Sequence, residues 1–245
     1  MAIKSIQYKH QTFQLSYDIL NPEKSRSLIF LHGWGSNKEL MKGAFGETMG
    51  AFRHIYIDLP GFGNSTCSRA LVTEDYANII ELFLAQINAN QDHMILGHSF
   101  GGKVALLLNP QILVLVGSAG IPVPKPLEVQ AKIALFKTLK VLGLSNLRAK
   151  FVAEDAKELS EIMYETFKNV VNEDLTSAFE AYRGKALLCW GKEDSATPLW
   201  TAEKMVELMP DARLAVFSGD HYFFLKEPEN VAKEIETTLL QTLQH

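Results

Sequence analysis

Residues 94–105, which read MILGHSFGGKVA, constrain the fold of this chain more than any other stretch. A short apolar run leads into Gly-x-Ser-x-Gly, and residues that favour helices follow. This order predicts a buried strand that turns sharply into a helix, with Ser99 at the tip of the turn. Gly97 and Gly101 fit such a turn because larger side chains would not fit where the strand and helix backbones approach. The Ser99 hydroxyl is therefore expected at a helix N-terminus, on a strained backbone.

Length and composition limit the classes of protein to consider. A chain of 245 residues can bury one substantial core, so we expect a single α/β domain with room for an insertion. The net charge of −4 gives no indication of binding to nucleic acid or to an anionic membrane. Cys67 and Cys189 are too few for a disulfide framework or a zinc site. The start of the chain lacks the apolar core of a signal peptide and no run approaches a membrane span, so the expected location is cytoplasmic.

Short apolar runs alternate with helical patterns through most of the chain. Besides the strand before Ser99, strands are predicted over residues 3–8, 12–19, 28–31, 54–58, 112–116, 186–190 and 214–217. The first two form a predicted antiparallel hairpin. Helices are predicted over residues 37–49, 73–87, 100–108, 198–209 and 228–243, with Thr73 as a good N-cap. This alternation predicts a mostly parallel eight-stranded sheet with helices on both faces.

The alternation breaks at residues 121–126, which contain three prolines. From there to about residue 182 the sequence predicts only helices, over residues 129–142 and 154–171. We interpret this interval as a helical cap over the carboxyl ends of the strands. The predicted division is a core domain over residues 1–121 and 184–245, with the cap at residues 122–183.

Three polar residues follow strands in the order expected for a nucleophile, an acid and a base. Ser99 follows the central strand, Asp194 follows the next-to-last strand and His221 follows the last. A serine hydroxyl needs a base to take its proton, and that base needs an orienting carboxylate. Glu193 and Asp220 are alternatives for the acid. Because neighbouring side chains usually diverge, Asp220 reaches the adjacent His221 ring only awkwardly, and we favour Asp194.

Attack by serine on a carbonyl also requires two preorganised donors for the oxyanion. The expected donors are the backbone N–H groups of Phe100, after the nucleophile, and of Trp34, in the loop after an earlier strand. The Trp34 and Phe100 side chains would shape the pocket or serve as core aromatics. His32 and His98 flank these groups and either touch substrate or make structural hydrogen bonds.

Together these motifs resemble the α/β-hydrolase superfamily. The resemblance is carried by residues 32–35 (HGWG), 58–65 (DLPGFGNS), 97–102 (GHSFGG) and 191–194 (GKED), in the family's order and spacing. It implies the α/β-hydrolase fold and a cofactor-independent serine esterase that cleaves small or medium acyl esters. No metal, nucleotide or redox cofactor is implied, since phosphate-cradling glycine patterns and metal-ligand clusters are absent from the sequence.

Two groups within the superfamily are similar to this chain. One comprises esterases of biotin synthesis, which cleave the methyl ester of a pimeloyl-carrier protein. The other comprises meta-cleavage-product hydrolases, which split carbon–carbon bonds and tend to carry Asn before the nucleophile and Trp after the catalytic histidine. This chain has His98 and Tyr222 at those positions, which argues against carbon–carbon cleavage. A third hypothesis is a non-catalytic binding protein with the same fold, although binding proteins of this superfamily usually lack part of the triad.

The predicted cap suggests what the substrate could be. Candidate pocket residues are Phe136 and Leu139 in the cap and Tyr222 and Phe223 after His221, with packed core as their alternative role. Basic residues gather in the first part of the cap, at Lys125, Lys132, Lys137, Lys140, Arg148 and Lys150. They could steer an acidic acyl carrier protein towards the pocket, or simply face solvent and attract the acidic stretch that follows.

Overall fold

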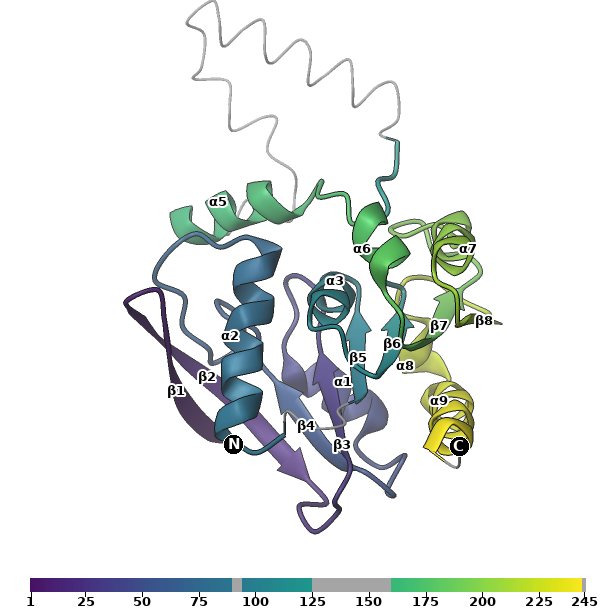
Figure 1. Cartoon of the computed structure of the whole chain (residues 1–245), viewed down its shortest axis with the longest axis horizontal. Helices are drawn as coiled ribbons and strands as arrows, with labels where there is room; N and C mark the ends of the chain where they lie inside the picture. Colours follow the sequence, from purple (N-terminus) through teal and green to yellow (C-terminus); the bar gives the residue numbers. More distant parts are fainter. Residues whose placement is uncertain (90–93, 125–159, 244–245) are drawn as a thin grey trace, which may run out of the picture.

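The structure is a computed structural model that describes residues 1–89, 94–124 and 160–243. Within these residues an eight-stranded sheet has the order β1-β2-β4-β3-β5-β6-β7-β8 (Figure 1). Its strands are β1 Ala2–Tyr8, β2 Gln11–Leu20, β3 Ser27–Leu31, β4 Arg53–Ile57, β5 Met94–His98, β6 Ile112–Val116, β7 Lys185–Gly191 and β8 Ala212–Phe217. The pairs β1–β2 and β2–β4 are antiparallel, and every other pair is parallel. The mostly parallel eight-stranded sheet predicted from the sequence is confirmed.

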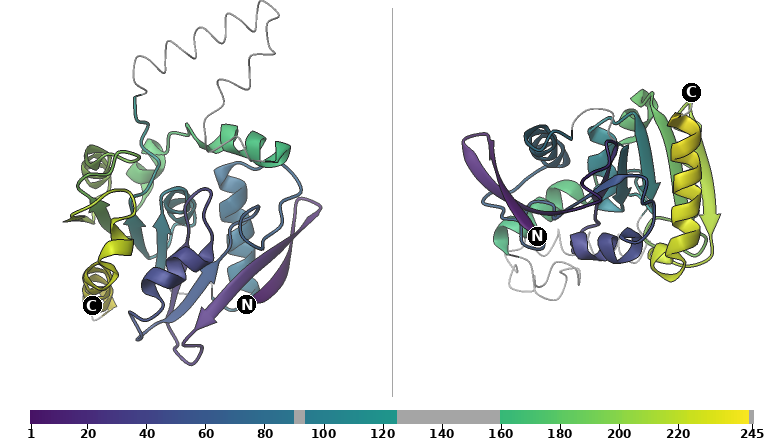
Figure 2. Two further views of the ribbon diagram at one scale, coloured as in Figure 1. Left: turned by 180° about the vertical axis from the view of Figure 1, so that it is seen from behind. Right: turned by 90° about the horizontal axis from the view of Figure 1, so that it is seen from below.

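Helices cover both faces of this sheet (Figure 2). They are α1 Lys38–Phe45, α2 Thr73–Gln86, α3 Phe100–Leu107, α5 Glu161–Val170, α6 Thr176–Ala181, α7 Leu199–Leu208, α8 Phe223–Lys226 and α9 Pro228–Leu243. One core cluster packs α1, α8 and α9 against the sheet, and the other packs α2, α3 and α7 against the opposite face. Strands β3, β5 and β6 are fully buried because both of their faces are covered.

Two predicted helix boundaries differ from the structure for local reasons. Helix α1 begins after Asn37, whose side chain accepts the Glu39 N–H at 3.0 Å, as expected for an N-cap. It ends at Phe45 rather than near residue 49, where Met49 takes a left-handed conformation with φ 49°. Thr73 is the first residue of α2 rather than its cap; the Asp75 carboxylate instead accepts the N–H of the preceding Val72 at 3.2 Å.

Helices α5 and α6 lie between β6 and β7 in the chain. Figure 1 places them at the end of the sheet toward which the arrows of β3, β5 and β6 point. The predicted helix over residues 129–142 lies outside the described residues, as does the first part of the one predicted over 154–171. The domain boundaries at residues 121–122 and 183–184 stay a prediction. Among the described helices, none has the length and apolar character needed to cross a membrane.

Candidate active site

Ser99 lies at the tip of a sharp turn between β5 and α3. Its backbone has φ 51° and ψ −114°, a conformation that residues other than glycine rarely adopt. The two flanking glycines are required by close approach. A Cβ on Gly97 would lie 2.4 Å from the Gly101 carbonyl oxygen, and one on Gly101 would lie 2.3 Å from the Leu31 carbonyl oxygen. The turn predicted from the Gly-x-Ser-x-Gly pattern is therefore present.

His221 and Asp194 form a direct hydrogen bond. The Nδ1 of His221 lies 2.8 Å from Oδ2 of Asp194, which is 5% exposed. Thr197 supports the carboxylate, with its hydroxyl 2.8 Å from Oδ2 and its backbone N–H 2.9 Å from Oδ1. Burial raises the pKa of Asp194, but the bonds from His221 and Thr197 outweigh it and hold that pKa below its ordinary value. The carboxylate is thus ionised and ready to orient the imidazole.

The two alternative acids make other contacts. Glu193 is exposed, and its carboxylate accepts the backbone N–H of Gly219. Asp220 accepts the N–H of Tyr222 at 3.0 Å and pairs with Lys226 at 3.3 Å. Among the hydrogen bonds of the described residues, only Asp194 offers a carboxylate to the His221 ring.

The turn after β6 brings Ser99 close to this pair. The Ser99 N–H donates to the Val116 carbonyl, and the Ser99 carbonyl accepts the Ala119 N–H, both at 3.1 Å. Between them Gly117 has φ 52°, and a Cβ there would lie 3.3 Å from both Asp194 Oδ2 and His221 Nδ1. The same four-residue turn therefore contacts the Ser99 backbone on one side and the His221–Asp194 pair on the other.

The two expected oxyanion donors belong to segments next to Ser99. A Cβ on Gly33, next to Trp34, would lie 3.1 Å from the Ser99 Cβ. Across the described part of the chain, no hydrogen bond is donated by the backbone N–H of Trp34 or of Phe100. The Trp34 ring packs against Phe62, Phe100 and Phe167, with centroid distances of 4.9, 5.5 and 5.3 Å. Among the described residues both N–H groups are thus without a protein acceptor, and aromatic rings pack around the Trp34 side chain.

His32 and His98 are both buried. His32 donates from Nδ1 to the Gly33 carbonyl at 2.8 Å and accepts the Leu59 N–H at Nε2 at 3.0 Å. The Nε2 of His98 lies 3.2 Å from the His221 carbonyl oxygen, and its Nδ1 is buried with no partner among the described residues. Burial lowers the pKa of His32 to about 4 and that of His98 to about 3. Both rings are therefore neutral at physiological pH and hold backbone segments around the site.

Of the remaining predicted pocket residues, Tyr222 lies near the site and Phe223 lies in the core. The Tyr222 ring is exposed and lies 5.4 Å from the rings of His98 and His221. Phe223 is 1% exposed and stacks on Phe217 in the core, which is the alternative weighed from the sequence. The other predicted pocket residues, Phe136 and Leu139, lie outside the described residues. So do the basic residues Lys125, Lys132, Lys137, Lys140, Arg148 and Lys150.

Sequence analysis missed three residues at the site. Thr197 had a signal, because it lies three residues after Asp194, within reach of an Asx-type turn. Gly117 directly follows a buried strand, where a glycine indicates that other atoms approach the backbone closely; here they are side-chain atoms of Asp194 and His221. Phe167 had no local signal for its contact with Trp34, because nothing in its own helix marks it. Within residues 1–89, 94–124 and 160–243, no three His, Cys, Asp or Glu side chains gather in a way that could hold a metal ion.

Comparison with known proteins agrees with this geometry. A profile described as "Alpha/beta hydrolase family" matches residues 28–234. The chain belongs to the alpha/beta hydrolase family. It is 26% identical over 238 residues to a pimeloyl-[acyl-carrier protein] methyl ester esterase of Vibrio campbellii, covering 82% of this chain and 90% of that one. Family membership and the esterase among the relatives support an ester-hydrolysing enzyme.

Solved structures of alpha/beta hydrolases share the fold. An esterase from Exiguobacterium antarcticum superposes with a TM-score of 0.75 at 23% identity, covering 98% of this chain and 99% of that one. A meta-cleavage product hydrolase from Pseudomonas fluorescens superposes with a TM-score of 0.72 at 17% identity, covering 98% of both chains. At these identities the likeness establishes the alpha/beta hydrolase fold, and both kinds of enzyme have it.

Proposed function

We propose that the protein is a serine esterase that cleaves small or medium acyl esters through an acyl-enzyme. Ser99 is the nucleophile, His221 the general base and Asp194 the residue that orients His221. The observation that carries the proposal is the 2.8 Å bond between His221 Nδ1 and Asp194, beside a serine on a left-handed turn. Because Asp194 engages Nδ1, the Nε2 of His221 is left to accept the serine proton.

In the proposed reaction Ser99 Oγ attacks the ester carbonyl while His221 takes its proton. The carbonyl oxygen becomes an oxyanion, which the N–H groups of Trp34 and Phe100 stabilise. As the tetrahedral intermediate collapses, the C–O bond of the ester breaks and His221 gives the proton to the departing alcohol. Water activated by the same histidine then adds to the acyl-enzyme, and release of the carboxylic acid restores Ser99.

The finer substrate assignment rests on the Vibrio campbellii relative, whose name specifies a methyl ester on an acyl carrier protein. We propose a substrate of this class, with the basic residues of 125–150 attracting the acidic carrier. Reversing the charge of Lys132, Lys137 and Lys140 together should then lower turnover of a carrier-linked ester and spare a small neutral ester. Equal loss on both substrates would remove the carrier from the proposal. The cytoplasmic location expected from the sequence stays a prediction.

The first experiment is hydrolysis of p-nitrophenyl esters of increasing acyl length by the wild type and by Ser99→Ala. We expect a peak at one acyl length and, in the variant, loss of activity by about a million-fold, as in serine hydrolases that lose their nucleophile. A fluorophosphonate probe should label Ser99 in the wild type. Turnover of a dienone diketone in place of all esters would assign carbon–carbon cleavage instead. Absence of any turnover or labelling would favour a binding protein.

A further inference from the structure

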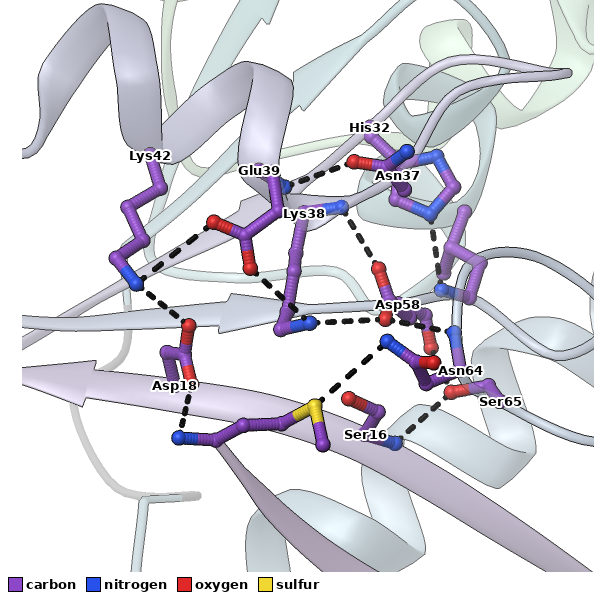
Figure 3. Close-up of polar contacts among 12 residues, drawn as sticks. Ser16, Asp18, His32, Asn37, Lys38, Glu39, Lys42, Asp58, Asn64 and Ser65 are labelled. Carbon is purple, nitrogen blue, oxygen red and sulfur yellow. Dashed lines mark hydrogen bonds and ion pairs between the residues drawn. The ribbon is translucent and has the colours of Figure 1, made fainter.

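Two loops beside the nucleophile are joined by reciprocal hydrogen bonds. The oxyanion loop, residues 32–37, follows β3 and contains Trp34; the proline loop, residues 58–65, follows β4. His32, at the start of the oxyanion loop, accepts the Leu59 N–H at 3.0 Å. Asp58, at the start of the proline loop, accepts the N–H of Lys38 at 2.8 Å, just past the other end of the oxyanion loop (Figure 3). The oxyanion loop is thus fastened to the proline loop at both of its ends.

Asp58 makes most of these contacts and is completely buried. Its Oδ1 accepts the Lys38 N–H, and its Oδ2 accepts the Asn64 N–H at 3.0 Å and the Lys38 ammonium at 3.0 Å. Figure 3 shows the carboxylate between the backbone of Lys38 and that of Asn64. Gly63 closes the remaining side, where a Cβ would lie 2.4 to 2.5 Å from the Asp58 carboxylate atoms. The carboxylate is therefore held in one orientation from four directions.

A buried ion pair of this kind does not by itself explain stability. The Lys38 side chain is 1% exposed and that of Asp58 is 0% exposed, so both charges have lost their hydration. Proteins in which well-packed apolar residues replace such a pair are often as stable as the original or more stable. An apolar pair could not accept the backbone N–H of Lys38, at the start of α1, and that of Asn64, in the proline loop. The geometry therefore favours a role in placing the loops.

We propose that Asp58 is a positioning residue that sets the Trp34 N–H in the oxyanion site, with Lys38 as its buried counter-charge. This inference rests on the proposed function, in which that N–H stabilises the oxyanion. The donor must be placed before the reaction, because any reorganisation during the chemical step reduces stabilisation of the transition state. Asp58 fixes one end of the loop that carries the donor, and His32 fixes the other.

The main test replaces the ion pair by an apolar pair of similar size, Asp58→Leu with Lys38→Met, which can accept neither backbone N–H. This double variant leaves no lone buried charge, so its fold should be retained. We expect kcat for a p-nitrophenyl ester to fall about tenfold to a hundredfold, with KM close to wild type, because oxyanion stabilisation acts mainly in the transition state. The matched control is Asp18→Leu with Lys42→Met, which removes a second Lys–Asp pair, with 2.7 Å between the charged groups. Among the contacts of the described residues, neither member of that pair, drawn in Figure 3, touches the oxyanion loop, so its loss should leave kcat unchanged.

A transition-state readout separates positioning from general loss of structure. An alkyl boronic acid forms a tetrahedral adduct with the serine, so its Ki should rise by the same factor by which kcat falls. Gly63→Ala supplies a second, steric route, because its Cβ would displace the Asp58 carboxylate while both charges remain. Gly63 lies in an exposed turn but has φ 53°, a conformation that is costly for alanine, so circular dichroism checks that the variant folds before kcat is compared.

Wild-type kcat and Ki in the folded double variant would overturn the proposal, and so would wild-type kcat in Gly63→Ala. A fall in kcat accompanied by an unchanged Ki would also overturn it, because the defect would then lie outside the oxyanion site. Labelling of wild-type Ser99 is measured in parallel. If Ser99 neither reacts nor supports turnover, the proposed function fails and the role of Asp58 fails with it; if both succeed, only the variants decide the role of Asp58.

Discussion

Single residues at the site hold conformations and contacts that are unfavourable elsewhere. Ser99 has φ 51°, which is costly for a residue with a Cβ, and the turn is maintained because Gly97 and Gly101 let two backbones approach. Asp194 is buried, yet Thr197 and His221 donate enough hydrogen bonds to keep it ionised. The backbone strain at Ser99 and the loss of hydration at Asp194 are therefore offset by contacts with neighbouring residues.

The choice among the three acids is testable by neutral substitution. Asp194→Asn should lower kcat by about 10,000-fold, because the amide cannot hold His221 in the tautomer that accepts the serine proton. Glu193→Gln and Asp220→Asn should leave kcat close to wild type, since their carboxylates contact Gly219, Tyr222 and Lys226 instead. Ester hydrolysis at saturating substrate gives the measurement. A larger loss in either control than in Asp194→Asn would reassign the acid.

At the scale of elements, the C-terminal half of α5 is fixed to the core by hydrogen bonds. Leu71, in the loop before α2, donates its N–H to the Thr166 hydroxyl at 3.1 Å, and its carbonyl accepts from the Asn169 amide at 3.1 Å. On the other side Lys103, on the helix that follows Ser99, donates to the Val170 carbonyl at 2.6 Å. The end of α5 is therefore attached directly to α3, the helix that follows Ser99.

Removing the Lys103 ammonium should loosen α5. Lys103 also pairs with Glu173 at 2.9 Å, and its side chain is 3% exposed. We expect Lys103→Met to destabilise the protein by about 2 kcal/mol, the range for hydrogen bonds to charged groups. Urea unfolding measures the loss, and amide exchange should accelerate along α5. As a control, Lys204→Met, which breaks an exposed pair with Glu207, should change stability by less than about 0.5 kcal/mol. Equal losses in both variants would contradict the anchoring role.

For the whole molecule, the sheet separates two cores and buries several titratable rings between them. His32, His54 and His98 lie in or beside this central sheet, and burial lowers the pKa of each. In the unfolded chain these rings have ordinary pKa values near 6.5. The unfolded state therefore binds more protons than the folded state at mildly acidic pH.

This difference predicts how stability depends on pH. The contribution of His32 is complete above its unfolded pKa of about 6.5 and is lost progressively as the pH falls toward its folded value of about 4. The loss for this one fully buried ring is about 3 kcal/mol over that window. Urea unfolding at a series of pH values between 7.5 and 4.5 tests it. His32→Asn should flatten the slope, whereas the exposed His10→Gln should retain it. An unchanged slope in His32→Asn would contradict the assignment.

Local patterns in the sequence were sufficient for most elements. The buried strands follow from apolar runs such as residues 28–31, and α9 was predicted with its bounds at Pro228 and Leu243. The sharp turn at Ser99 followed from two glycines at fixed spacing. The predictions fell short at helix ends and at the shortest helix, for local reasons. Helix α1 ends at Phe45, before the left-handed Met49, and α8 has only four residues, too few to show a helical period.

The sequence by itself determined the order of strands and helices, the turn that presents Ser99, and the three candidate acids, because each depends on residues within a few positions of one another. Only the tertiary structure decided that Asp194 contacts His221, that Asp58 joins two loops, and that Lys103 fixes the end of α5. These contacts join residues 20 to 67 positions apart. Alignment of the carboxyl ends of the parallel strands brings all three carboxylates to one edge of the sheet. The turn after β7, in which Asp194 accepts from Thr197 while Glu193 accepts the Gly219 N–H, decides which of them meets the His221 ring.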